Sequence, residues 1–358
     1  METLQIAEFV LPATRRPEGY FEEVEIAFEK AVSNSADIRR YYRLGSEVLC
    51  LRFAGEALLK SLSMAFSHLE LPPCLPSLTI NCWDCDSTDT PMPPPPWLMT
   101  AYGPRGHIQG FNNEVIRTVY NPDNSILHMY NNRRRLGIYW MQHPRILPYW
   151  EMSFPMRCII HWWSKLRPFQ LVHAGAVGFD KGGILLTGKS GSGKSTTALS
   201  CVRSGLKYVG DDYVMISNEP IPFVYSLYNT GKLVPNSVNM LPHLSEKISN
   251  KESLSSEKAL FFLNEHFPEK LSAGFPIKAI FLPRVTHQKN SRIRQASSAE
   301  SLLALAPTTV LHLEGDGKIA FDKMRLLTTS VPNFWLDLGT DVEQIPYLIA
   351  DFLERSNG

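Results

Sequence analysis

The stretch Gly183-Ile-Leu-Leu-Thr-Gly-Lys-Ser-Gly-Ser-Gly-Lys-Ser195 decides the fold of this chain. Residues 183–187 are typical of a short buried strand, and residues 188–195 match the phosphate-loop (Walker A) pattern, GxxxxGK followed by Ser or Thr, without a mismatch. Residues 196–203 carry apolar side chains at helical spacing. A strand, a glycine-rich loop and a helix in this order predict an α/β domain whose loop cradles nucleotide phosphates.

Each residue type in this loop suits a phosphate ligand. Glycines let consecutive backbone N–H groups turn inward toward phosphate oxygens. Lys194 is expected to reach the β- and γ-phosphates, and the Ser195 hydroxyl suits a bound Mg²⁺. ATP and Mg²⁺ are therefore the expected cofactors. The residues expected to contact the nucleotide are Gly188, Ser190, Gly191, Ser192, Gly193, Lys194, Ser195 and Thr196.

Two adjacent carboxylates, Asp211 and Asp212, interrupt an otherwise apolar, strand-like stretch over residues 207–216. Unpaired charge in a buried strand is costly, which favours a functional use for the pair. One acid would hold Mg²⁺, directly or through water, and the other would accept a proton from an attacking hydroxyl. The alternative is a pair of carboxylates that caps a turn at the end of a strand.

His173 lies upstream of the loop, in the strand-like stretch 169–176. A histidine in an apolar strand is more often a packed core residue than a catalytic one. The order of His173, the loop and the Asp211-Asp212 pair nevertheless resembles the catalytic domain of HPr kinase/phosphorylase, which shows an HG dipeptide, a GDSGxGKS loop and an ADD strand in this order. The resemblance implies a P-loop fold related to phosphoenolpyruvate carboxykinase.

The same resemblance implies roles for individual residues. Lys194 and Ser195 would contact phosphate and metal, with Asp211 joining Ser195 at the metal. Asp211 or Asp212 would accept the proton, and Asp212 is the preferred choice. His173 would face the substrate or support the carboxylates, so the implied catalytic residues are His173, Lys194, Asp211 and Asp212.

The chain departs from that family in the stretch after the acidic pair. Residues 224–233, Val-Tyr-Ser-Leu-Tyr-Asn-Thr-Gly-Lys-Leu, stand where the family has LEIRGLG, so the metal-binding glutamate of that signature has no clear counterpart. The pattern of the whole chain looks more like the HPr-kinase-related proteins of bacterial biosynthetic clusters, with HAGAVG, DDYV, YSLYNTGKL, LAPTTVL and LDLG as shared features. Some of these resemble kinases that phosphorylate a serine of a ribosomal precursor peptide, as in lasso-peptide maturation.

These observations predict a serine kinase that acts on a peptide or protein acceptor. A small-molecule kinase for a sugar or amino acid is the first alternative, and a nucleotide-binding regulatory protein without phosphoryl transfer is the second. The net charge of +1 excludes a general binder of nucleic acid. No apolar run reaches membrane-spanning length, the first residues do not resemble a secretory signal, and six cysteines in 358 residues form no disulfide framework. We therefore expect a cytoplasmic protein without a membrane partner, and a homo-oligomer is compatible with the sequence.

From residue 169 onward, predicted strands, glycine turns and a helix follow one another closely, which places a domain boundary between residues 150 and 168. We expect a mixed α+β domain over residues 1–160 that recognises the substrate. Residues 161–358 are expected to form an HPr-kinase-like catalytic domain. Four consecutive prolines at 93–96 indicate a stiff connector packed on its own domain. The arginine run 133–135 is expected at a turn, either as a solvated loop or as a contact for an acidic substrate.

Periodicity and turn residues predict several further elements. We expect strands at 40–53, 78–83 and 276–283, a β-hairpin formed by 113–120 and 126–140, and helices at 56–71, 156–166, 300–305 and 345–353, the third ending at Pro307. Arg284, Arg292 and Arg294 follow the strand at 276–283. One of them could neutralise the charge of a transferring phosphate, or all three lie on surface loops.

Overall fold

A computed structural model describes residues 16–312 and 317–356, and it divides the chain into two compact units. Unit 1 comprises residues 1–39, 51–59 and 78–146, and unit 2 comprises residues 40–50, 60–77 and 147–358. The first residues, which are not expected to form a secretory signal, lie outside the described residues. None of the described helices is long and apolar enough to cross a membrane.

These units differ from the two predicted domains in one respect. Residues 40–50, 60–77 and 147–160 group with the phosphate-loop half of the chain in unit 2, although they precede the predicted boundary at residue 160. The predicted α/β class of that half is confirmed, since it contains a mixed sheet with helices on both faces.

Unit 2 is built on a nine-stranded sheet whose centre carries the phosphate loop. The main path of the sheet runs β11-β9-β10-β16-β13-β12-β8, and β18 extends it from β16 and pairs with β17. The β10–β16 and β16–β18 pairs are parallel, and the other pairs in this sheet are antiparallel. The strands are β8 (Phe169–Val172), β9 (Gly175–Phe179), β10 (Gly182–Leu186), β11 (Lys207–Gly210), β12 (Val214–Ser217), β13 (Phe223–Tyr225), β16 (Gly274–Val285), β17 (Arg292–Gln295) and β18 (Asn333–Leu338).

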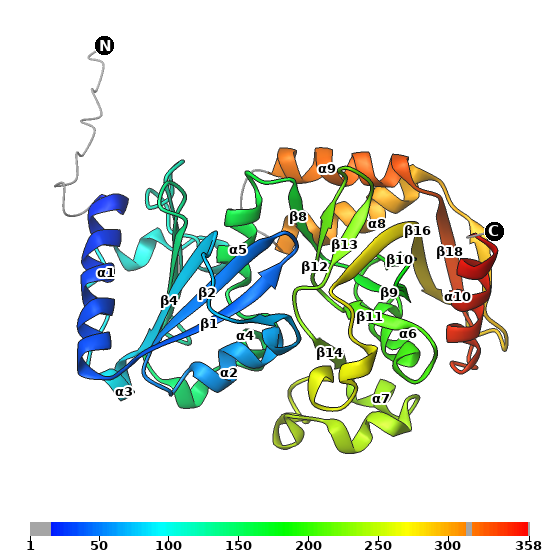
Figure 1. The fold of residues 1–358 in the computed structure, drawn as a ribbon, viewed down its shortest axis with the longest axis horizontal. Coiled ribbons are helices and arrows are strands. Elements are labelled where there is room, and N and C mark those ends of the chain that lie inside the picture. Colours follow the sequence, from blue (N-terminus) through cyan, green and yellow to red (C-terminus); the bar gives the residue numbers. More distant parts are fainter. Residues whose placement is uncertain (1–15, 313–316, 357–358) are drawn as a thin grey trace, which may run out of the picture. The chain divides into compact units, whose positions relative to one another are not determined.

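Helices cover both faces of this sheet (Figure 1). Apolar side chains on the two faces form two separate cores. Helices α6 (Lys194–Ser200) and α10 (Gln344–Arg355) bury side chains such as Leu199 and Ile349 on one face. Helices α8 (Ser298–His312) and α9 (Gly317–Ser330) bury Leu305 and Met324 on the other. The phosphate loop is thereby attached to a sheet that is shielded from water on both sides.

Shorter elements complete unit 2. A two-stranded sheet pairs β14 with β15 in antiparallel register, and β3 pairs with β1. These elements are α4 (Tyr149–Ser153), α5 (Arg157–Ser164), α7 (Pro235–Val238), β14 (Thr230–Leu233), β15 (Ala259–Phe262), β3 (Glu70–Leu71) and the 3₁₀ segment Met64–Leu69.

Unit 1 packs helix α1 (Pro17–Asn34) against strands β4 (Leu78–Asp84), β7 (Leu136–Met141), β6 (Ile126–Asn131) and β5 (Ile116–Asn121). These four strands are consecutive in a seven-stranded sheet of order β3-β1-β2-β4-β7-β6-β5. Helix α3 (Cys85–Thr88) also belongs to unit 1, whereas β1 (Asp37–Leu44), β2 (Glu47–Ala54) and α2 (Leu59–Ser63) each have residues in both units. One helix on a mixed sheet agrees with the predicted α+β class.

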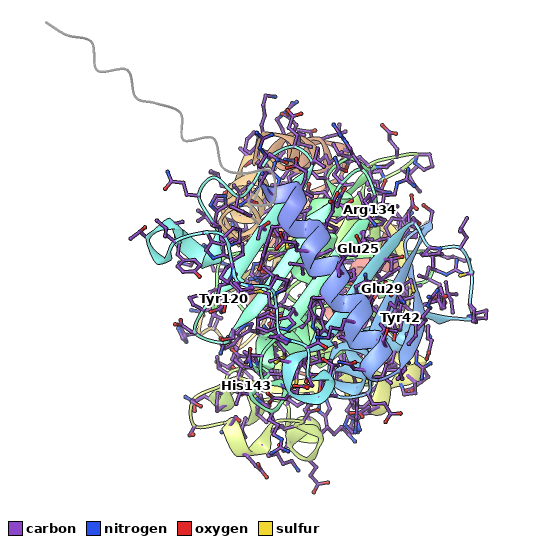
Figure 2. All side chains as sticks on the ribbon, turned by 90° about the vertical axis from the view of Figure 1, so that its left-hand side faces the viewer. Glu25, Glu29, Tyr42, Tyr120, Arg134 and His143 are labelled. Atoms are coloured by element: carbon purple, nitrogen blue, oxygen red, sulfur yellow. The ribbon has the colours of Figure 1, made fainter. Side chains whose placement is uncertain are left out.

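The polyproline connector and the arginine run both lie in unit 1. Trp97, just after the prolines, is buried against Tyr20, whose hydroxyl donates a hydrogen bond to the Pro93 carbonyl, so the connector is packed as expected. The arginine run lies at the predicted turn between β6 and β7. There Arg134 donates hydrogen bonds of 2.5 and 2.6 Å to Glu25 of α1 (Figure 2). A partner on the chain itself favours the structural interpretation of this arginine.

Most of the predicted elements are confirmed, and three differ. The predicted strand 40–53 is two strands, β1 and β2, because Gly45 turns the chain with a φ of +62°. The predicted helix 56–71 is the short α2 followed by a 3₁₀ segment. The predicted helix 300–305 is longer, since α8 continues through Pro307 to His312. Pro307 is exposed and lies within the helix, where it removes one backbone N–H donor.

Candidate active site

The predicted phosphate loop connects β10 to α6. Gly188, Gly191 and Gly193 have positive φ angles of 154°, 77° and 104°. A Cβ atom on Gly193 would lie 2.3 Å from Leu338 Cδ1, so the loop needs glycine there for space as well as for conformation. Ser190, Ser192 and the first turn of α6, with Ser195 and Thr196, complete the predicted set along one continuous segment.

Lys194 lies within the curve of the loop. Its Nζ donates hydrogen bonds to the carbonyl oxygens of Gly188 (2.6 Å) and Lys189 (3.1 Å). Burial lowers the pKa of this ammonium group, and the charges of Asp211 and Asp212 partly offset that effect. A cation held against the loop backbone is placed to contact anionic oxygens that the loop N–H groups bind.

Ser195 and Asp211 meet, although they are 16 residues apart in the sequence. The Ser195 hydroxyl donates a 3.1 Å hydrogen bond to Asp211 Oδ1, and the Lys232 backbone N–H lies 3.4 Å from Asp211 Oδ2. Burial, together with the neighbouring charge of Asp212, raises the pKa of Asp211 to about 6. Asp211 is thus a buried carboxylate beside a hydroxyl.

This hydroxyl–carboxylate pair fits a magnesium ion. Mg²⁺ takes hard oxygen ligands and is commonly bound by one or two protein groups together with water and substrate phosphates. The described residues contain no cluster of three or more His, Cys, Asp or Glu side chains that could enclose a metal ion on its own. Ser195 and Asp211 would therefore hold the ion jointly with a bound nucleotide.

Asp212 has different surroundings from its neighbour. Its backbone is left-handed, with a φ of 65°, a conformation that is uncommon for residues other than glycine. Lys232 Nζ lies 2.6 Å from Asp212 Oδ2, and His173 Nε2 lies 3.4 Å from Oδ1. Burial by itself would raise the pKa of Asp212, but the charge of Lys232 and the hydrogen bond from His173 hold it well below its usual value. The structure thus brings together all four residues of the predicted catalytic set.

Lys232 is a site residue that the sequence reasoning missed. It is buried in β14, in the stretch that replaces the LEIRGLG signature. Its Nζ also lies 4.1 Å from the centre of the Phe154 ring. A lysine within a strand of small and apolar residues was the available signal, because such a lysine is seldom buried without a carboxylate partner.

The three arginines at 284, 292 and 294 share one carboxylate partner on the chain itself. Arg284, Arg292 and Arg294 all contact Asp337 of β18, at 2.9, 3.0 and 2.7 Å. The Asp337 side chain is only 1% exposed, so this carboxylate is neutralised by the arginines that surround it. Of the two alternatives, neutralisation of a transferring phosphate by one of them or a place on surface loops, neither included this shared contact, which attaches the edge strand β17 to β18.

Comparison with known proteins identifies relatives for one segment of the chain. No family model matches the chain. Over 83 residues it is 41% identical to the HPr kinase/phosphorylase of Geobacillus sp. (strain WCH70) and 39% identical to that of Bacillus subtilis (strain 168). Each match covers 23% of this chain and 24% of the relative, so the chain spans about a quarter of the length of the curated relatives it matches.

Among solved structures, the HPr(Ser) kinase/phosphatase from Coxiella burnetii aligns with 52% of this chain and 95% of its own, at 16% identity and a TM-score of 0.30. The sequence match is the stronger of the two likenesses. Over that matched segment, the chain is similar to the HPr kinase/phosphorylases.

Proposed function

We propose that this protein is an ATP- and Mg²⁺-dependent kinase that transfers the γ-phosphate of ATP to a serine hydroxyl of a peptide or protein. The observation that carries the proposal is the contact between Ser195 and Asp211, with Asp212 next to it and the Lys194 ammonium inside the loop. Phosphoryl transfer needs a phosphate cradle, ligands for a divalent ion and a group that receives the hydroxyl proton. These residues provide all three at one place.

In the proposed reaction each residue has one task. The loop N–H groups and Lys194 bind the phosphates. Ser195 and Asp211 would hold Mg²⁺, and a bound ion would supply positive charge next to the phosphate oxygens. The acceptor oxygen forms a bond to the γ-phosphorus while the bond from that phosphorus to the β-phosphate oxygen breaks, and ADP leaves. Asp212 accepts the proton of the hydroxyl.

His173 and Lys232 keep Asp212 ionised and oriented before the acceptor arrives. An ionised carboxylate accepts the hydrogen bond of the incoming hydroxyl, which aligns the nucleophile with the phosphorus. The two residues are therefore positioning residues that act through Asp212. This division of roles follows the family resemblance for His173 and adds Lys232 to it.

The acceptor, the partners and the location follow from the resemblance. We propose a precursor peptide of a biosynthetic cluster as the acceptor, residues 1–160 as the part that recognises it, and the cytoplasm as the compartment. Assembly into a homo-oligomer belongs to the same proposal. The relatives are themselves named for HPr as their substrate, which makes a protein or peptide acceptor preferable to a sugar or amino acid.

The test compares two lysines of the same loop. Lys194→Ala is expected to lower ATP-dependent phosphate transfer by at least about 100-fold and to reduce the thermal stabilisation by Mg·ATP. Lys189→Ala is the matched control, because the Lys189 side chain is exposed and only its carbonyl contacts Lys194. Radiolabelled transfer into serine-containing peptides measures the first effect, and a melting curve measures the second. Wild-type ATP response and turnover in Lys194→Ala would show that this loop is not the nucleotide site.

A further inference from the structure

Lys258 is a cation on the side of the β14–β15 sheet that faces the candidate active site. Leu233 of β14 pairs with Ala259 of β15, and both side chains pack into the core around α6. Lys232 pairs with Leu260, so these two side chains project from the opposite face, where Lys232 forms the ion pair already described. The same alternation, continued to the residue just before β15, places Lys258 on this face as well.

The charges of residues 257 and 258 act on groups of the site. Burial lowers the pKa of the Lys194 ammonium group, and the positive charge of Lys258 lowers it further. Burial raises the pKa of the Tyr149 phenol, and the negative charges of Glu257 and Asp212 raise it further. The segment that leads into β15 therefore lies beside both the phosphate loop and the acidic pair, as the strand register requires.

The backbone at Lys258 is held in place by one side chain. Asn250 Nδ2 donates a 2.9 Å hydrogen bond to the Lys258 carbonyl, and Asn250 Oδ1 accepts one of 2.8 Å from the Leu260 N–H. The Ser249 N–H donates to the Leu260 carbonyl at 2.8 Å. These contacts close residues 249–260 into a loop with a fixed base. A lysine on such a base is placed before its ligand arrives, which reduces the entropy lost on binding.

The charge of Lys258 is available to a ligand. Among the residues that the structure describes, its ammonium group has no hydrogen-bond acceptor and no carboxylate within ion-pair distance. The neighbouring Glu257 carboxylate instead accepts a 3.2 Å hydrogen bond from Asn250 Nδ2. Lys194 and Lys258 are thus two like charges that repel each other at the loop, and an anion that contacts both would remove this repulsion.

We infer that Lys258 contacts the γ-phosphate of a bound nucleotide, as a second lysine beside the phosphate loop. The inference rests on the proposed function, because it requires the loop to bind ATP. Asp212 receives the hydroxyl that attacks the γ-phosphorus, so the phosphate nearest to the face with Lys232 and Lys258 is the γ-phosphate. Positive charge at that place stabilises the negative charge on the phosphate oxygens during transfer.

Equilibrium binding of two nucleotides tests this without any need for phosphate transfer. The probes are ADP and a non-hydrolysable ATP analogue with NH in place of the β,γ-bridging oxygen, each titrated with Mg²⁺ into the full chain. Lys258→Gln is expected to weaken binding of the ATP analogue by at least about fivefold and binding of ADP by less than about twofold. Lys258→Arg keeps the charge and should retain most of the affinity for the ATP analogue.

Lys251→Gln is the matched control, because it removes an exposed lysine of the same loop, and it should keep both wild-type affinities. Lys258→Met keeps the length of the side chain and repeats the test if Lys258→Gln does not fold, which a melting curve shows. An unchanged affinity for the ATP analogue in the folded variant, or an equal loss of affinity for ADP, would overturn the inference.

Lys194→Ala in the same titration separates this inference from the proposed function. Weakened nucleotide binding in Lys194→Ala together with wild-type binding in Lys258→Gln would overturn the inference and leave the nucleotide site in place. A wild-type chain that binds neither nucleotide would contradict the kinase proposal and the inference with it. A Lys258-dependent preference for the ATP analogue in a protein that transfers no phosphate would support the inference and contradict the kinase proposal.

Discussion

Asp211 and Asp212 are neighbours in the sequence with opposite electrostatic surroundings. Asp211 faces a neutral hydroxyl, and burial together with the charge of Asp212 raises its pKa to about 6. Asp212 faces Lys232 and His173, which lower its pKa. Two neighbouring carboxyl groups whose surroundings shift their pKa values in opposite directions are suited to different tasks. We therefore expect Asp211 to take a metal ion and Asp212, held ionised by Lys232, to accept the proton.

The metal role of Asp211 predicts a change in magnesium dependence. Asp211→Asn keeps the size of the side chain but weakens its bond to a cation, so the Mg²⁺ concentration for half-maximal activity should rise by at least about tenfold. Raised Mg²⁺ should restore part of the turnover. The measurement is initial rate against Mg²⁺ at saturating ATP. A magnesium curve identical to that of the wild type would remove Asp211 from the metal site.

The proton-accepting role of Asp212 predicts a different outcome. Asp212→Asn should lower kcat by about 10² to 10⁴, since proton acceptance contributes only as the hydroxyl attacks, while nucleotide affinity stays near wild type. Added Mg²⁺ should not restore the rate. Asp180→Asn, an exposed acid in the turn between β9 and β10, is the control for loss of one charge. Full activity in Asp212→Asn would contradict the assignment.

At the scale of single elements, the edge strand β17 depends on one carboxylate. Asp337 of β18 accepts contacts from two arginines of β17 and from Arg284 of β16. Burial would raise the pKa of Asp337, but the arginine contacts hold it below its usual value. The carboxylate therefore stabilises the fold above its ordinary pKa, and that contribution is lost as the pH falls.

Removing this carboxylate should loosen the strand. Asp337→Asn is expected to lower Tm by roughly 3–5 °C at neutral pH, because three arginines are left without their common partner and all three are partly solvated. Asp322→Asn, an exposed acid on α9, is expected to change Tm by much less. The measurement is the Tm of each variant, taken from a thermal melting curve at neutral pH. Equal melting of the two variants would show that the arginine cluster adds nothing to stability.

The 3₁₀ segment Met64–Leu69 holds a histidine that is kept neutral. His68 Nε2 lies 2.6 Å from Ser226 Oγ, whose own proton is donated to the Val209 carbonyl, so Nε2 carries the hydrogen. Nδ1 then faces the amide donor of Asn229 at 3.5 Å. A second proton, on Nδ1, would face the N–H group of Asn229, which is also a donor. Burial lowers the pKa of His68 to about 3, so the ring stays neutral.

The sign of the resulting pH dependence follows from linkage. Between pH 6.5 and about 3 the unfolded chain binds a proton at residue 68 that the folded chain does not, so stability falls as the pH falls below 6.5. At pH 5 the loss from this one group is at most about 2 kcal/mol. His68→Gln should reduce the difference in urea-unfolding free energy between pH 7.5 and pH 5, and His287→Gln, at an exposed position, should not. An unchanged difference in His68→Gln would contradict the buried neutral histidine.

At the scale of the whole molecule, unit 2 is assembled from segments far apart in the sequence. The Asn229 side chain donates to the carbonyl oxygens of Met64 (2.8 Å) and Ala65 (3.0 Å), and the Phe66 ring lies 5.2 Å from that of Tyr228. Residues 149–157 are bonded to Tyr228 and Thr230. Two stretches from the first 160 residues are therefore part of the body that carries the candidate site.

A chain that begins at residue 161 should for this reason be unstable. It would expose buried apolar rings and leave Asn229 and Thr230 without acceptors, and each buried polar group that loses its partner costs about 1–3 kcal/mol. We expect residues 161–358 alone to show no cooperative melting transition under conditions in which the full chain shows one. A fragment that melts cooperatively near the Tm of the full chain would show that these N-terminal contacts are dispensable.

The sequence by itself determined the features that depend on residues close together in the chain. The strand, loop and helix around Lys194, the hairpin of β5 and β6, and helices α5 and α10 follow from side-chain period, turn residues and glycine positions, all of which act within a few residues. Ser195 and Asp211 are 16 residues apart, so local sequence patterns do not predict their contact. The resemblance to a known family supplied the expectation that both hold the same metal ion.

Only the tertiary structure decided which charges meet. Lys232 reaches Asp212 from the small β14–β15 sheet, Arg134 reaches Glu25 across unit 1, and the three arginines near β16 converge on Asp337. Arg157 is brought to the hydroxyl of Tyr213 from a segment 56 residues earlier in the chain. The sequence shows that a side chain is charged, but it does not show whether that charge contacts an opposite charge or water. The difference lies in which strands and helices pack beside it, and that is set by burial of apolar surface across the whole unit.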